Sequence, residues 1–139
     1  MPLLHPNKTF ELKNMEQYLE LCTLIEEQLE MVCSEKTRAS TKFIINEALD
    51  NALEHGEFPI KIEFSNHLDK KELLIRVVDS GNGFLGVQKM ELIRKKGTDF
   101  LLNEALLNTR GRGILMMATM AKAISYNNKG NELLLVIAN

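Results

Sequence analysis

Apolar positions in the first third of the chain recur at the spacing of two amphipathic helices. The first helix is predicted to begin near Asn14, a residue type that suits a helix N-cap, and to continue to about Val32. Its apolar positions are Met15, Leu19, Cys22, Ile25 and Leu29. A second helix is predicted over residues 35–55, because Gly56 is typical of the position at which a helix ends. The alternation over residues 8–12 predicts a short strand before both helices.

The rest of the chain is dominated by patterns typical of strands. Residues 59–65 alternate between apolar and polar side chains, and residues 73–78 form a denser apolar run that is typical of a central strand. These two strands are predicted to form a hairpin. A helix over residues 113–123 is followed by a second predicted hairpin, with strands at 124–127 and 132–137. Because helices alternate with hairpins, the pattern predicts an α/β (α+β) two-layer sandwich with a mixed, mostly antiparallel sheet rather than a parallel βαβ array.

Composition and charge narrow the class of protein. The chain has 139 residues and contains no repeat or Pro/Gly-rich linker, so we expect a single domain over residues 1–139. The 17 Lys and Arg residues against 19 Asp and Glu residues give a formal net charge of -2. The overall charge of the chain therefore does not attract nucleic acid or an anionic membrane. No apolar run is long enough to span a bilayer and the N-terminus lacks the apolar segment of a signal peptide, so a cytoplasmic location is expected.

A polar stripe along the second predicted helix is the first candidate for chemistry. Glu47, Asn51 and Glu54 follow at i, i+4 and i+7, and a helical wheel places them opposite the apolar face. Asn is a poor residue inside a helix because its side chain competes with the backbone for hydrogen bonds, which argues against an ordinary solvated stripe. The Asn51 amide oxygen can bind Mg²⁺ beside phosphate oxygens, and the Glu47 carboxylate can orient or deprotonate a hydroxyl or a water.

A second candidate lies where the strand over residues 73–78 ends. Asp79 follows this strand directly, and Gly81 and Gly83 after it permit a close approach of the backbone. One interpretation is an Asx-type turn that closes the strand. The functional interpretation is that the Asp79 carboxylate accepts a hydrogen bond from the exocyclic amine of adenine, which would distinguish adenine from guanine.

The third candidate opens the last predicted helix. Gly111 and Gly113 expose backbone N–H groups at the positive end of a helix dipole, which is a favourable place for an anion. Arg110 and Arg112 beside them suit phosphate groups. Solvated arginines in a Gly-rich turn are the alternative interpretation. No Gly-Lys-Ser/Thr follows, so the segment is not a Walker A sequence.

The three segments together resemble the motifs of a known superfamily. Residues 47–56 (Glu-Ala-Leu-Asp-Asn-Ala-Leu-Glu-His-Gly) resemble the N-box of the GHKL (Bergerat-fold) ATPases. Residues 79–84 and 111–114 resemble the first and second glycine boxes, and all three motifs stand in the family's order. Within the superfamily the closest resemblance is to the small bacterial anti-sigma-factor serine/threonine kinases, which have the Asn-Ala-x-x-His form of the N-box.

This resemblance implies a fold, a ligand and a set of roles. The fold would be a sheet covered on one face by about three helices, and the ligand would be ATP with Mg²⁺. Asn51 would bind Mg²⁺, Glu47 would act as base or orient the acceptor, and Asp79 would contact adenine.

The glycine boxes and the segment between them would hold the rest of the nucleotide. Gly81 and Gly83 would shape the pocket beneath the base, whereas Gly111 and Gly113 would bring backbone N–H groups to the phosphates. Residues 85–109 would form a mobile ATP lid.

Three functions follow from these motifs. The leading expectation is a kinase that phosphorylates a small anti-sigma-factor antagonist, with sequestration of a sigma factor as a further role. The second is an ATP-gated protein-binding module without phosphoryl transfer. The third is a stand-alone histidine-kinase ATPase domain, which ranks lowest because residues 1–34 are too short for the usual helical pair and His5 and His67 are poor phosphate acceptors. The resemblance also implies a homodimer, with the exposed side of the first helix as one surface.

Overall fold

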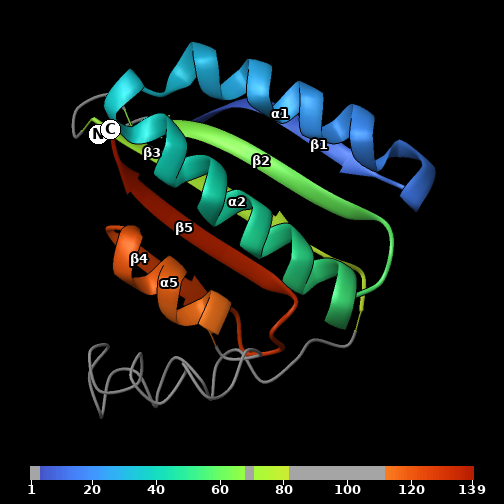
Figure 1. Cartoon of the computed structure of the whole chain (residues 1–139). Coiled ribbons are helices and arrows are strands. Elements are labelled where there is room, and N and C mark those ends of the chain that lie inside the picture. Colours follow the sequence, from blue (N-terminus) through green and yellow to red (C-terminus); the bar gives the residue numbers. More distant parts are fainter. Residues whose placement is uncertain (1–3, 68–70, 82–111) are drawn as a thin grey trace.

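The computed structural model describes residues 4–67, 71–81 and 112–139, which Figure 1 shows as a sheet with helices packed on one side. The described strands are β1 (Leu4–Leu12), β2 (Ile60–His67), β3 (Glu72–Val78), β4 (Ala123–Tyr126) and β5 (Glu132–Ala138). They form a five-stranded sheet in the order β1-β2-β3-β5-β4, and every described pairing is antiparallel. β5 therefore lies between β3 and β4, which brings the C-terminal hairpin beside β3.

Helices cover one face of this sheet. The described helical elements are the 3₁₀ turn η1 (Met15–Gln17) and the α-helices α1 (Tyr18–Val32), α2 (Glu35–His55) and α5 (Arg112–Met120). α1 packs against β1, α2 against β3 and β5, and α5 against α2 and β4. The predicted two-layer α+β architecture is confirmed, and the described part of the sheet is antiparallel throughout. None of the described helices is both long enough and apolar enough to cross a bilayer.

Element boundaries agree with the sequence prediction to within a few residues. α2 begins and ends at the predicted residues, but the first helix begins with η1. Asn14 is the N-cap residue of η1 as predicted, but it makes no side-chain capping bond; next to it, the Lys13 N–H donates to Gln17 Oε1 at 3.0 Å. α5 ends at Met120, earlier than predicted, because Ala123 already pairs with β5.

The hydrophobic core lies between the sheet and the helices. Alternation along the strands directs every second residue toward the helices. The buried residues of β2, β3 and β5 are Ile60, Ile62, Phe64, Leu73, Ile75, Val77, Leu133, Leu135 and Ile137. The buried apolar residues of α1 and α2 that pack in the same cluster are Leu21, Ile25, Leu29, Ile44, Ile45, Ala48, Leu49 and Ala52. Because interiors are closely packed, this core fixes the C-terminal half of α2 relative to the end of β3.

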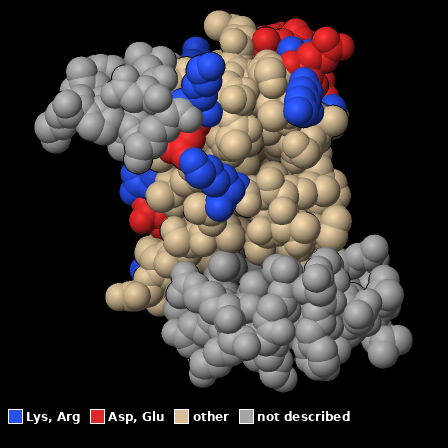
Figure 2. Space-filling view, turned by 90° about the vertical axis from the view of Figure 1, so that its left-hand side faces the viewer, with Lys and Arg blue, Asp and Glu red and all other residues tan. Residues whose placement is uncertain are grey.

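The other face of the sheet carries charged side chains among partly buried apolar ones. Arg76 on β3 pairs with Glu63 on β2, at 3.2 Å between Nη1 and Oε2, and with Glu132 on β5. Such exposed pairs stabilise a fold by at most about 1 kcal/mol. Figure 2 shows the molecule from one end, where basic and acidic side chains are intermixed in small groups between stretches of uncharged surface. The charges visible there therefore form a mixed pattern rather than a broad field of one sign.

Candidate functional site

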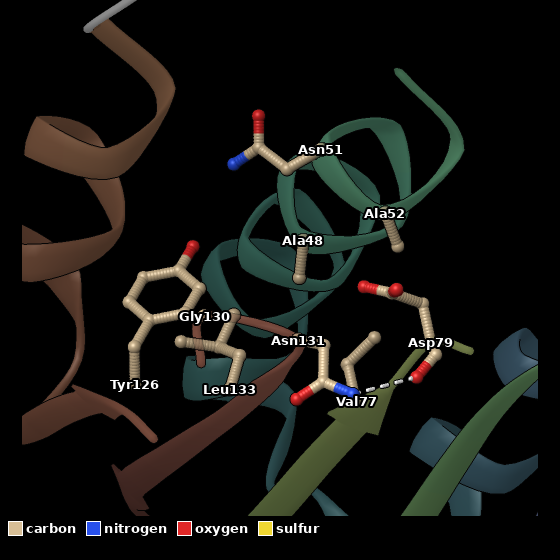
Figure 3. Close-up of a pocket in the computed structure, with 9 residues that line it drawn as sticks. All are labelled: Ala48, Asn51, Ala52, Val77, Asp79, Tyr126, Gly130, Asn131 and Leu133. Atoms are coloured by element: carbon tan, nitrogen blue, oxygen red, sulfur yellow. Dashed lines mark hydrogen bonds between the residues drawn. The ribbon is translucent and has the colours of Figure 1, made fainter. Parts of the chain in front are cut away.

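A hollow opens beside the C-terminal half of α2, next to the end of β3 and the turn between β4 and β5 (Figure 3). Its cavity volume is about 10 Å³, which is roughly the space that one water molecule needs. The hollow is lined by Ala48, Asn51, Ala52, Val77, Asp79, Tyr126, Gly130, Asn131 and Leu133. Small apolar side chains such as Ala48 and Ala52 line it together with the polar side chains of Asn51 and Asp79. The structure thus brings together two of the residues predicted to bind a nucleotide.

The carboxylate of Asp79 is held in place directly after β3. Asp79 is only 8% exposed, and carboxylates are seldom buried to this extent without partners. Its Oδ1 accepts a hydrogen bond from the Gly81 N–H at 2.7 Å, while its own backbone N–H donates to the Asn131 carbonyl oxygen at 3.0 Å. The Asx-type turn suggested by the sequence is therefore present, and the same turn places Asp79 at the hollow.

Gly56, the residue after α2, does more than end the helix. Its N–H donates to the Ala52 carbonyl oxygen at 2.8 Å, and its φ of -104° is one that any residue adopts. A Cβ atom on Gly56 would lie 2.3 Å from Asp79 Cγ, well inside van der Waals contact. A Cβ atom on Gly81 would lie 3.0 Å from Asp79 Oδ1. The missing side chain of Gly56 is therefore what makes room for Asp79.

A Gly56→Ala variant is expected to lose about 1–3 kcal/mol of unfolding free energy, because the new methyl group must displace the Asp79 carboxyl group or the end of α2. Urea unfolding measures the loss. The same substitution should cost less in an Asp79→Ala background, where the atoms that the methyl group meets are absent. Equal costs in both backgrounds would show that the contact with Asp79 is not the cause.

The turn between β4 and β5 forms a further wall of the hollow that the sequence motifs did not include. Asn127 Oδ1 accepts hydrogen bonds from the three backbone N–H groups of residues 130–132 at 2.7, 3.1 and 3.2 Å. Gly130 has a φ of 83°, a left-handed conformation that favours glycine. The turn directs Asn131 Nδ2 to the Asp79 carbonyl oxygen at 3.2 Å, drawn as the dashed line in Figure 3. Asp79 is thus fixed by the C-terminal hairpin as well as by its own turn.

The Asn51 carboxamide lies at the margin of the hollow close to Tyr126. Its Nδ2 atom is buried, and no described residue accepts a hydrogen bond from it with ordinary geometry. Burial raises the pKa of the Tyr126 hydroxyl, and a hydrogen-bonding contact with the Asn51 side chain lowers that pKa in part. The two groups therefore face each other across a contact that is longer or less well aligned than an ordinary hydrogen bond. A buried amide with unused hydrogen-bonding capacity fits a site that takes a polar ligand.

Glu47 lies on α2 one turn before Asn51. Of the three residues expected opposite the apolar face, only Glu54 is exposed, whereas Glu47 and Asn51 are half-buried on the flank of the helix. Burial raises the pKa of the Glu47 carboxyl group, and the negative charge of Asp50 raises it further. Glu47 is not among the residues that line the hollow. It is therefore a neighbour of the candidate site whose role in catalysis stays a prediction.

The second glycine box falls at the edge of the described residues. The predicted site residues and segment outside the described part are Gly83, Arg110, Gly111 and residues 85–109. Arg112 and Gly113 form the start of α5, so a helix opens within this box as predicted. Binding of phosphate by these arginines and glycines stays a prediction.

The sequence of residues 13–137 matches the histidine kinase-like ATPase domain family. This match spans nearly the whole chain, so the protein belongs to that family. Membership supports the GHKL superfamily indicated by the three motifs and implies ATP binding. No curated protein matches the chain.

Proposed function

We propose that the chain is an ATP-binding serine/threonine-protein kinase of the anti-sigma-factor type. It phosphorylates a small anti-sigma-factor antagonist and, as a second role, sequesters a sigma factor. The observation that carries this proposal is that Asn51 and Asp79 line one partly apolar hollow in a member of the histidine kinase-like ATPase family. The motifs of the N-box and the glycine boxes support the narrower assignment to the anti-sigma-factor type.

The residues of the hollow suit ATP as substrate and Mg²⁺ as its cofactor. Asp79 accepts a hydrogen bond from the exocyclic amine of adenine, and the small side chains of Ala48 and Ala52 leave an apolar surface for a flat ring. Asn51 would hold Mg²⁺ through its amide oxygen. Few protein ligands are needed, because Mg²⁺ keeps several waters and takes further oxygens from the substrate phosphates.

The transfer step requires a base beside the phosphate-binding end of the site. The acceptor serine or threonine oxygen forms a bond to the γ-phosphorus while the bond from that phosphorus to the bridging oxygen of ADP breaks. The hydroxyl proton passes to the Glu47 carboxylate, and ADP leaves. Burial and the charge of Asp50 raise the pKa of Glu47, which strengthens it as a base whenever it is ionised. Mg²⁺ held at Asn51 would supply positive charge beside the phosphates.

The experiment that tests this proposal recovers partners from native lysate on immobilised protein, with Mg²⁺-ATP compared against Mg²⁺-ADP. With γ-labelled ATP, we expect a small partner to be retained and to carry an acid-stable label on serine or threonine. Absence of any labelled protein after long incubation would contradict the kinase assignment. Equal retention of partners with ATP and ADP would contradict nucleotide-dependent recognition.

One observation favours a second candidate, an ATP-gated binding module without phosphoryl transfer. Glu47, the only base assigned to transfer, does not line the hollow. In such a module ATP shifts the protein toward the state that binds a partner, to the extent that it binds that state better. ATP-dependent retention without label supports this candidate. An acid-labile label on a histidine would instead indicate a histidine-kinase ATPase domain that acts in trans.

A further inference from the structure

Tyr126 is a large polar residue of the hollow to which the proposed function gives no role. It is the last residue of β4, and its ring packs against the hydrophobic core. Its hydroxyl oxygen and the Asn51 amide nitrogen are both buried. Figure 3 shows the amide nitrogen on the side of the Tyr126 hydroxyl and the amide oxygen turned away from it.

The orientation of this carboxamide decides what Asn51 can bind. The oxygen accepts hydrogen bonds and can bind a cation, whereas the NH₂ group only donates and disfavours a cation. Rotation of the amide by half a turn exchanges the two ends with almost no change in shape. An asparagine that binds Mg²⁺ through one protein oxygen therefore benefits from a neighbour that holds its nitrogen.

We propose that Tyr126 is a positioning residue whose hydroxyl oxygen accepts a hydrogen bond from Asn51 Nδ2 and so leaves the amide oxygen for Mg²⁺. This inference rests on the proposed function, in which Asn51 binds the metal. Asn51 Nδ2 is buried and makes no hydrogen bond of ordinary geometry with the described residues, so a small turn of either side chain would complete this one. Tyr126 acts through Asn51, because the core holds its ring while the buried amide nitrogen lies on the side of its hydroxyl.

The test uses Tyr126→Phe in the full chain, which removes the hydroxyl and keeps the ring. Isothermal titration calorimetry gives the ATP affinity with Mg²⁺ and with EDTA, and the ratio of the two affinities reports the metal. Loss of one net hydrogen bond should lower this ratio about three- to tenfold. Ser125→Ala is the matched control, since it also removes a hydroxyl from β4 but at an exposed position. It should keep the wild-type ratio.

A second test, made in the Asn51→Asp background, distinguishes the orientation of the side chain of residue 51 from a general effect of Tyr126→Phe on the hollow. In Asn51→Asp both ends of the side chain are acceptor oxygens, so orientation no longer matters and the Tyr126 hydroxyl can only donate to them; adding Tyr126→Phe should therefore not lower the ratio of that background. The inference is overturned if Tyr126→Phe keeps the wild-type ratio, or if it lowers the ratio equally in the Asn51→Asp background. A wild-type protein whose ATP affinity does not respond to Mg²⁺ would overturn the metal site itself, and this inference with it.

Discussion

A Glu47→Ala variant is expected to lose phosphoryl transfer by about 10²–10⁴-fold, the usual effect of removing a general base. ATP binding should persist, because Glu47 does not line the hollow that contains Asn51 and Asp79. The measurement is the initial rate of partner labelling at saturating Mg²⁺-ATP, with the ATP affinity of the variant determined in parallel. Normal labelling by Glu47→Ala would show that the assigned base is wrong.

The pH dependence of transfer gives an independent check on Glu47. Its pKa lies above the ordinary value of 4.5, so the carboxylate becomes protonated, and the base is lost, at a higher pH than for an exposed glutamate. The transfer rate should therefore fall as the pH decreases through this raised pKa. Asp50→Asn removes the smaller of the two causes and should move the fall toward lower pH, with little change at neutral pH. A fall that does not move would indicate that another group titrates.

Much of the fold could be predicted because periodicity is local information. The bounds of α2 and both hairpins follow from apolar spacing and from turn residues within a few positions. The start of the first helical segment after Asn14 was predictable too, but the 3₁₀ form of its first turn and the lack of a side-chain capping bond from Asn14 were not. Caps compete over small energy differences, so sequence alone ranks them poorly.

The candidate site was predictable only in part, because its walls depend on contacts between distant segments. The motifs indicated Asn51 and Asp79, which do line one hollow. Nothing in the local sequence shows that Gly56 faces the Asp79 carboxyl group, since that contact arises from how α2 meets the end of β3. Tyr126 and Asn131 enter the site because β5 lies between β3 and β4, and strand order is not encoded in periodicity.

The partial burial of Glu47 on α2 is a further property of the site that the sequence pattern does not predict. A wheel separates an apolar face from a polar one, but it cannot show how far neighbouring elements extend around the helix. Here α5 packs against α2, and Glu47 and Asn51 become half-buried while Asp50 and Glu54 stay exposed. Partial burial is what raises the pKa of Glu47. The property that suits this residue to act as a base therefore comes from tertiary packing.

An Asp79→Asn variant is expected to weaken ATP binding by about 10- to 100-fold, which corresponds to the loss of one hydrogen bond to a charged group. A carboxylate has two acceptor oxygens, and Gly81 uses one of them at 2.7 Å. In an asparagine whose oxygen accepts the Gly81 N–H, an NH₂ group takes the place of the second oxygen, and this group cannot accept a hydrogen bond from the exocyclic amine of adenine. Calorimetric titration with ATP and with GTP measures the effect, and the preference for ATP over GTP should decrease.

A matched control comes from the same turn. Ser80→Ala removes the hydrogen bond from Ser80 Oγ to the Pro59 carbonyl oxygen, and Ser80 does not line the hollow. It should therefore keep the ATP affinity of the wild type. Asp79→Asn can still accept the Gly81 N–H, so its melting temperature should stay close to that of Ser80→Ala. A folded Asp79→Asn protein with wild-type ATP affinity would show that Asp79 does not contact the base, and the recognition of adenine would then have to be assigned to another wall of the hollow.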